Sequence, residues 1–89
     1  MFHVYILHSP GLNKFYAGQT DNLEKRFDDH NRGASPYTKH GSPWTLVVSF
    51  PVSSRTEAIK LESKIKSRGI KRFLLDINFP FSESNPGYH

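Results

Sequence analysis

The chain contains no cysteine. This absence excludes a disulfide framework, a cysteine-based zinc site and a thiol nucleophile. The sequence also lacks an apolar run of the length that crosses a bilayer, and its first residues do not follow the basic-then-apolar pattern of a secretion signal. We therefore expect a soluble, cytoplasmic protein with no membrane partner.

Internal repeats, low-complexity runs and interdomain linkers are also absent from the 89 residues, a length that fits one small domain. Hydrophobic residues make up 36% of the chain, including seven Phe, four Tyr and one Trp. This content is enough for a compact core and too much for a disordered chain. We expect one domain over residues 1–78, followed by an irregular tail over 79–89, where Pro80, Pro86 and Gly87 lie.

Acidic residues are the minority among the charged side chains. Twelve Lys and Arg stand against eight Asp and Glu, which gives a net charge of +4. A positive balance favours a polyanionic partner. Many small basic domains bind no nucleic acid, however, so the charge by itself does not identify a nucleic-acid-binding protein.

Two strands joined by a tight turn are expected at the N-terminus. Residues 2–8 and 14–20 are rich in strand-forming side chains, and the Ser-Pro-Gly-Leu sequence at 9–12 is typical of a turn. The pattern predicts an antiparallel hairpin. If 9–12 is the whole loop, Tyr5 lies opposite Tyr16 and the two phenols share one face; a five-residue loop would place them on opposite faces.

A helix is expected over residues 23–31, with Asp21 or Asn22 as its N-cap. The stripe at i, i+3, i+4 and i+7 contains two polar residues, Arg26 and His30, where a plain amphipathic helix would carry apolar ones. Arg26 and His30 are one turn apart, so both lie on the same side of the helix.

A loop rich in Gly, Ser and Pro, with room for one helical turn, is expected over residues 32–43. It leads to a third strand over residues 44–52. Larger apolar residues alternate there with smaller or more polar ones, which predicts one strongly apolar face made by Trp44, Leu46, Val48 and Phe50.

A second helix is expected over residues 55–67. Residues 54–57 have the Ser-x-x-Glu form of a capping box, and Gly69 is expected to stop the helix. Glu62 lies within or at the edge of the stripe that recurs at helical spacing, formed by Ala58, Leu61, Glu62 and Ile65.

Residues 70–78 predict a short third helix that covers the core with Phe73, Leu74 and Ile77. The fold class that follows is α+β. A three-stranded antiparallel sheet, made of the N-terminal hairpin and the third strand, is flanked by helices.

The order of these motifs resembles that of the GIY-YIG nuclease domain. Val4-Tyr5 stands where that family has the Ile-Tyr of its first motif, and Tyr16-Ala17-Gly18 stands for Tyr-Ile-Gly. The resemblance covers nearly the whole chain. It is strongest to the small stand-alone members related to the nuclease half of the excinuclease C subunit.

The later residues match the same family position by position. Arg26, ten residues after Tyr16, matches the family's catalytic arginine. His30 matches a position that carries His or Tyr in related enzymes. Glu62 matches the metal-binding glutamate.

Three departures from the family pattern are visible. His3 replaces the leading Gly of the first motif. The late Asn of the family has no clear match, and Asn78 is the nearest candidate. Some relatives have a lysine where this chain has Gln19, so the role of that lysine is absent or filled by another group.

The resemblance implies a metal-dependent endonuclease that hydrolyses DNA phosphodiester bonds, with structure-selective cleavage in DNA repair or recombination as the narrower expectation. Glu62 would hold one Mg²⁺ or Mn²⁺ ion. Arg26 would bind phosphate oxygens through its planar fork. Tyr16 would accept a proton from the attacking water, Tyr5 would position that water or the phosphate, and His30 would relay a proton or hold Tyr16 in place.

Each of these five residues also has an ordinary structural interpretation. The two tyrosines are common strand residues, and the histidine and arginine fit the end and the edge of a surface helix. Glu62 fits an exposed ion pair with Lys66 at i+4. Any single residue favours the structural interpretation. All five together, in this order, favour the nuclease site.

Half of the basic residues fall between positions 60 and 72, namely Lys60, Lys64, Lys66, Arg68, Lys71 and Arg72. They form either a solvated helix face or a surface that contacts the phosphate backbone of a nucleic acid. Besides the nuclease, two hypotheses stay open. One is a nucleic-acid-binding module without turnover. The other is a subunit that needs a protein partner to select its target. The sequence does not separate DNA from RNA as the substrate.

Overall fold

The structure, a computed structural model, describes residues 1–34 and 38–79. Its elements are β1 (Phe2–Ser9), β2 (Lys14–Thr20), α1 (Leu23–Asn31), a 3₁₀ turn η1 (Lys39–Gly41), β3 (Thr45–Val52), α2 (Arg55–Arg68) and α3 (Ile70–Asp76). The strands form one antiparallel sheet in the order β2-β1-β3. The predicted α+β fold is confirmed. Within the described ranges, no helix has the length and apolar character needed to span a membrane.

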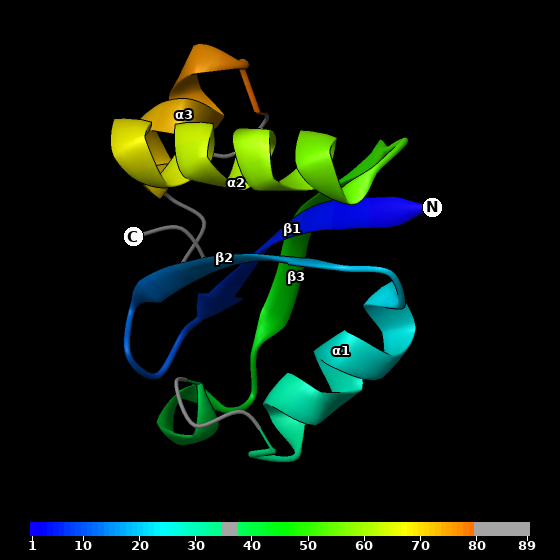
Figure 1. Ribbon diagram of the computed structural model, residues 1–89. Coiled ribbons are helices and arrows are strands. Elements are labelled where there is room, and N and C mark those ends of the chain that lie inside the picture. The colour runs from blue at the N-terminus through cyan, green and yellow to red at the C-terminus, as the bar shows by residue number, and fades with distance from the viewer. Residues whose placement is uncertain (35–37, 80–89) are drawn as a thin grey trace.

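The two faces of the sheet are covered by different helices (Figure 1). On one face, Val4 and Ile6 of β1 pack with Ile65 of α2 and Leu74 of α3, and all four side chains are fully buried. Full burial of one such side chain stabilises the fold by roughly 1.5 to 3 kcal/mol. The other face carries a second cluster, in which α1 packs on the sheet through Leu23 and Phe27.

The helices begin where their capping residues predict. The Asn22 side chain accepts a hydrogen bond from the backbone N–H of Lys25, and Ser54 caps α2 in the same way. Gly69 ends α2 with a φ of +93°, which is open to glycine because it has no Cβ. The third helix stops at Asp76, two residues before the predicted end. Asn78 has a left-handed backbone there, with a φ of +56°.

The register of the hairpin differs from the predicted one. The loop is 10–13 instead of 9–12, because Ser9 pairs with Lys14. Tyr5 therefore lies opposite Gly18, and Tyr16 lies opposite Leu7. The shift is two residues, which preserves the side of the sheet to which each side chain points. The predicted pairing of the tyrosines is wrong, but both still lie on the face that α1 covers.

The third strand does not keep one apolar face. The register between β1 and β3 shifts after Ile6, which pairs with Val48, whereas Leu7 pairs with Leu46. This bulge breaks the alternation. Val48 and Phe50 pack in the core under α2, whereas Trp44 joins the cluster under α1, and Leu46 is 42% exposed. The prediction of a single face was wrong because a bulge exchanges the two sides of a strand.

The predicted tail, residues 79–89, lies outside the described residues except for its first member. Phe79 packs against the main core, and its backbone N–H donates to the carbonyl of Leu74.

Candidate active site

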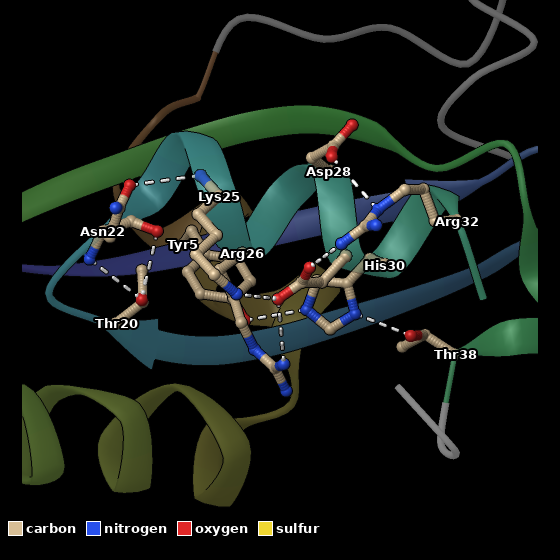
Figure 2. Close-up of polar contacts among 10 residues, drawn as sticks. Tyr5, Thr20, Asn22, Lys25, Arg26, Asp28, His30, Arg32 and Thr38 are labelled. Carbon is tan, nitrogen blue, oxygen red and sulfur yellow. Dashed lines mark hydrogen bonds and ion pairs between the residues drawn. The ribbon is translucent and has the colours of Figure 1, made fainter. Parts of the chain in front are cut away.

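The two tyrosines and the polar stripe of α1 meet on one face of the hairpin. Figure 2 shows Tyr5, Arg26 and His30 of this group. The ring centroids of Tyr5 and Tyr16 are 6.4 Å apart. His30 lies against both, with its ring centroid 5.8 Å from that of Tyr5 and 5.1 Å from that of Tyr16. Because Arg26 is one turn before His30, the helix brings its guanidinium to the same place.

A chain of hydrogen bonds runs inward from Tyr5. The phenol oxygen of Tyr5 is 2.9 Å from Nε2 of His30, and Nδ1 of His30 is 2.6 Å from Oγ1 of Thr38. All three side chains are at most 1% exposed. Both ring nitrogens of the histidine are therefore engaged, and His30 is held in one orientation.

The environment of Tyr5 favours its neutral form. Burial raises the pKa of the Tyr5 phenol from its ordinary 10.0 to about 12, and repulsion from a negative charge on Tyr16 adds to the effect. A hydrogen bond from the Arg26 side chain acts in the opposite direction. Desolvation outweighs the cation, so Tyr5 keeps its proton at neutral pH.

His30 is neutral for related reasons. Burial lowers the pKa of His30 below its ordinary 6.5, and the positive charge of Arg26 lowers it further. The negative charge of Asp29 opposes the shift without reversing it. A neutral imidazole has one donor and one acceptor, which suits a proton relay between two hydroxyl groups.

Asp29 anchors the cations of α1. Its carboxylate accepts hydrogen bonds from Lys25 and Arg32, which hold the pKa of Asp29 below its usual range. The carboxylate also lies 4.0 Å from Nη1 of Arg26. Figure 2 shows the Arg26 side chain leaving α1 and passing over β2. The Arg26 side chain is 37% exposed, so the mostly buried carboxylate of Asp29 orients it while it stays open to solvent.

Glu62 and Lys66 reach the site from α2. The Nζ atom of Lys66 is 2.7 Å from Oε2 of Glu62 and 6.0 Å from the centre of the Tyr16 ring. The charge of Glu62 also acts on Tyr5, whose pKa it raises slightly. Because α2 covers the opposite face of the sheet, these side chains reach around β2, which is an edge strand.

The structure thus brings Tyr5, Tyr16, Arg26, His30 and Glu62 into one neighbourhood. The structure also contains the ion pair with Lys66 that the structural interpretation of Glu62 predicts, because Lys66 donates a hydrogen bond to the Glu62 carboxylate. Lys66 provides a cation beside Tyr16. Asn78 has a structural role at the end of α3, where its backbone N–H donates to the carbonyl of Leu75.

The donor set near Glu62 fits only a sparsely coordinated ion. No group of three or more His, Asp or Glu residues suited to a metal occurs among residues 1–34 and 38–79. Mg²⁺ is commonly held by one or two carboxylates together with waters and substrate phosphates. Glu62, with its side chain 20% exposed, meets that minimal requirement.

The basic residues of α2 and α3 are all exposed, but they are not equally available. Lys66 is bonded to Glu62, and Arg68 forms a two-pronged hydrogen bond with Asp76. Lys64 and Arg68 line a surface hollow of about 600 Å³ next to Phe73. Lys60, Lys64, Lys71 and Arg72 are exposed as well.

Sequence reasoning missed three residues that organise the site. Thr38 belongs to a loop without a periodic pattern, so no signal pointed to it. Trp44 donates its indole N–H to the carbonyl of Thr38 at 2.8 Å. The backbone N–H of Trp44 donates to the Asn31 side chain, whose amide donates back to the Trp44 carbonyl. Asn31 and Trp44 thereby fix the end of the loop against α1.

Comparison with known proteins shows the family to which the chain belongs. The family model described as the GIY-YIG catalytic domain matches residues 1–72. The chain belongs to the GIY-YIG family. This finding confirms the resemblance inferred from the motifs. The GIY-YIG domain belongs to a superfamily of nucleases, and GIY-YIG nuclease domains act on nucleic acids.

The similar proteins are small members of the same family. A UPF0213 protein of Cronobacter sakazakii is 38% identical over 64 residues, which are 71% of this chain and 66% of that protein. A UPF0213 protein of Syntrophus aciditrophicus is 39% identical over 80 residues, covering 85% of this chain and 91% of the relative.

A solved structure supports the fold. The solution NMR structure of a UPF0213 protein from Bacillus halodurans matches 97% of this chain and 93% of its own, with a TM-score of 0.57 and 24% identity. At this identity the likeness concerns the fold alone.

Proposed function

We propose that this GIY-YIG protein is a metal-dependent endonuclease that hydrolyses DNA phosphodiester bonds. The observation that carries the proposal is the convergence of Tyr16, Arg26 and Glu62, from three separate elements, at one edge of the sheet. These groups are a phenol, a guanidinium and a carboxylate. They supply what phosphodiester hydrolysis needs, namely a proton acceptor, a phosphate clamp and a metal ligand.

The surroundings of the two tyrosines suit them to different roles. Tyr5 has a pKa of about 12 and hydrogen-bonds to His30, so it is a poor base at neutral pH and serves to position groups. Tyr16 is only half-buried and is overlaid by the Lys66 ammonium. A tyrosine takes a proton from water only as a phenolate, and a neighbouring positive charge stabilises the negative charge of that form.

Arg26 is suited to the phosphate. A guanidinium has five donors, and its planar fork matches phosphate oxygens. Tyr5 and Asp29 fix its direction without enclosing it. Glu62 would hold one Mg²⁺ or Mn²⁺ ion. When bound, such an ion supplies Lewis-acid stabilisation of the charge on the phosphate and the leaving oxygen.

The exposed lysines of α2 and α3 extend the positive field beside the site. DNA binding that rests on phosphate contacts falls steeply as the salt concentration rises. Arg68 forms two hydrogen bonds with Asp76, whereas Lys64 forms no ion pair with the residues that the structure describes, so Arg68 should contribute less than Lys64 to the salt dependence. Structure-selective cleavage in DNA repair or recombination is the narrower form of the proposal.

A cleavage assay tests the proposal directly. Branched, flapped and plain duplex DNA are incubated with the protein and Mg²⁺ or Mn²⁺, with single-stranded RNA as a further substrate. Glu62→Gln should abolish cleavage while leaving DNA binding nearly intact. The matched control is Glu57→Gln, which removes the same charge from the first turn of α2 and should cleave normally.

The same assay separates the alternatives. If the wild type and Glu62→Gln bind DNA equally and neither cleaves it, the protein is a binding module and the nuclease proposal is wrong. If cleavage appears only after a cellular fraction is added, and only with the wild type, the protein is a nuclease subunit that needs a partner.

A further inference from the structure

A surface hollow shared by α2 and α3 lies outside the candidate active site. Figure 1 shows the two helices side by side. The hollow has a volume of about 600 Å³, and the described residues that line it are Lys64, Ser67, Arg68, Phe73, Asp76 and Ile77. Ligand pockets in proteins have volumes of about 300 to 1,000 Å³. The hollow therefore has the size of a site for a small molecule or for one unit of a polymer.

One wall of the hollow is held by an ion pair between the ends of the two helices. Arg68 is the last residue of α2, and Asp76 is the last residue of α3. Nε of Arg68 is 2.6 Å from Oδ2 of Asp76, and Nη2 of Arg68 is 3.1 Å from Oδ1. A two-pronged contact of this kind fixes direction as well as distance. The pair therefore holds the ends of α2 and α3 in a defined relation at the rim of the hollow.

The hollow carries an excess of positive charge. Hydrogen bonds from Arg68 lower the pKa of Asp76 below its usual range, and the positive charges of Arg68, Arg72 and Lys64 lower it further. Three cations thus act on one carboxylate, and both oxygens of that carboxylate are bonded to Arg68. The surroundings of the hollow therefore favour an anion.

The remaining lining of the hollow is apolar apart from one hydroxyl group. Phe73 is 6% exposed and Ile77 is 43% exposed, and Ser67 adds a hydroxyl that both donates and accepts. An inorganic anion gains nothing from apolar side chains. A nucleotide has a phosphate for the cations, a flat ring face for the apolar side chains and polar ring edges for the hydroxyl. The lining therefore suits a nucleotide better than a simple ion.

The sequence of α2 links the hollow to the candidate active site. Lys66 bonds to Glu62 and lies over the Tyr16 ring, and the next residue, Ser67, lines the hollow. Successive residues of a helix point about 100° apart, and a helix with its side chains is about 10 to 12 Å across. A nucleic-acid strand that crosses α2 therefore passes from one place to the other within a few nucleotides.

We propose that this hollow binds one unpaired nucleotide of the nucleic acid, with its base against Ile77 and Phe73 and its phosphate near Lys64. The inference deepens the proposed function and rests on it for the position of the cut. A paired base is stacked inside a duplex, so a duplex offers the hollow only its phosphates. The substrate class that follows is nucleic acid with unpaired nucleotides a few positions from the cleaved bond.

Binding can be measured without cleavage, by fluorescence anisotropy in the presence of EDTA. The probes are a short single-stranded DNA and the same strand built from abasic sites, which keeps every phosphate and lacks the bases. The wild type should bind the normal strand about 10-fold more tightly, within the range measured for one base packed on an aromatic side chain. In ¹H–¹⁵N spectra, the amide signals of Ser67 and Ile77 should move when the normal strand is added.

Two charge-neutral variants locate the base. Ser67→Phe fills the hollow, and Ile77→Gln removes its exposed apolar side chain. Both should lose most of the preference for the normal strand over the abasic strand. The matched controls are Thr56→Phe, on the same side of α2 about three turns earlier, and Leu75→Gln, an exposed residue of α3 outside the hollow. Both controls should keep the preference. Amide spectra show which variants are folded, and either folded hollow variant is sufficient for the test.

Three results would overturn the proposal. The first is equal affinity of the wild type for the normal and the abasic strand, which would make the hollow at most an anion site. The second is a preference that the folded hollow variants keep. The third is nuclear Overhauser contacts that place residues 80–89 in the hollow of the DNA-bound protein, because the hollow would then belong to the chain itself.

The cleavage assay connects the hollow to the proposed function. Flapped DNA should be cut faster than plain duplex, and Ser67→Phe should lose most of this advantage while Thr56→Phe keeps it. An advantage that Ser67→Phe retains would contradict the proposal. Absence of cleavage in every protein would refute the nuclease proposal and leave the binding result standing. Cleavage by a protein that binds normal and abasic strands equally would refute the nucleotide site alone.

Discussion

The phenol of Tyr5 crosses directly over Gly18, its partner in β2. A Cβ atom at position 18 would lie 2.6 Å from Oη and 2.8 Å from Cζ of Tyr5, closer than side-chain atoms approach one another. The same atom would be 3.1 Å from the Tyr16 ring. The glycine that ends the Tyr16-Ala17-Gly18 motif is therefore needed for space, because any side chain there would displace both tyrosines.

Gly18→Ala should consequently damage the site as well as the fold. Overpacking of this kind typically costs about 1 to 3 kcal/mol, and the displaced Tyr5 phenol should lose its bond to His30. Urea unfolding and DNA cleavage measure the two effects. Gly11→Ala is the matched control, because a Cβ at position 11 meets nothing within 4 Å. Equal stability of the two variants would contradict the close contact.

Alkaline pH should destabilise the protein through Tyr5. The unfolded chain loses the Tyr5 proton near 10.0, whereas the folded chain keeps it until the pKa of about 12. Stability is therefore lost as pH rises between these values, by at most about 1.4 kcal/mol per pH unit. Urea unfolding at about pH 9 and about pH 11 should show the loss in the wild type. Tyr5→Phe should show less of it, and an identical loss in both proteins would refute the assignment.

Mild acid should also destabilise the protein, through His30. The pKa of His30 in the folded chain is lowered from its ordinary 6.5. Below that pH, His30 therefore binds a proton more readily in the unfolded chain than in the folded chain. Stability should fall as pH drops below 6.5. His30→Gln, which cannot titrate, should flatten this part of the profile in chemical unfolding. Losses that begin only near and below 3.8 belong to Asp29 and Asp76, whose pKa values are both lowered by hydrogen bonds from basic side chains, and provide an internal reference.

The ion pair between Lys66 and Glu62 predicts a competition with the metal. Lys66 bonds to the carboxylate that we propose as the metal ligand, so Lys66→Met should lower the Mg²⁺ concentration that gives half-maximal cleavage at saturating DNA. Loss of the ammonium above Tyr16 should at the same time lower the maximal rate. Lys14→Met, an exposed change at the start of β2, is the control. An unchanged Mg²⁺ dependence would show that Lys66 and the ion do not share the carboxylate.

The sequence predicted the elements well because their ends carry strong local signals. Asn22, Ser54 and Gly69 define helix ends through side-chain hydrogen bonds or a positive φ. The hairpin register was predicted two residues away from the observed one, since a turn-forming sequence does not fix which residues close the loop. The face of each tyrosine was still correct, because an even shift leaves it unchanged.

Other features lie beyond local patterns. The bulge that sends Trp44 to the α1 face arises from pairing between β1 and β3, strands that are far apart in the sequence. Thr38 acts through contacts with His30 and Trp44 that only the folded chain brings together. For Glu62, helical spacing predicted both a place near the candidate site and an ion pair with Lys66. In the structure Glu62 lies near the candidate site and also forms this ion pair.

The placement of β2 at the margin of the sheet leaves one side of this strand without a neighbouring strand in the sheet. An edge strand offers its outer backbone groups to any extended chain that can pair with them. A peptide or a second copy added along β2 would lie across the side chains that reach around that margin from α2, and would block access of the proposed nucleic-acid substrate to the site. Association along β3, at the far side of the sheet, would leave that route open.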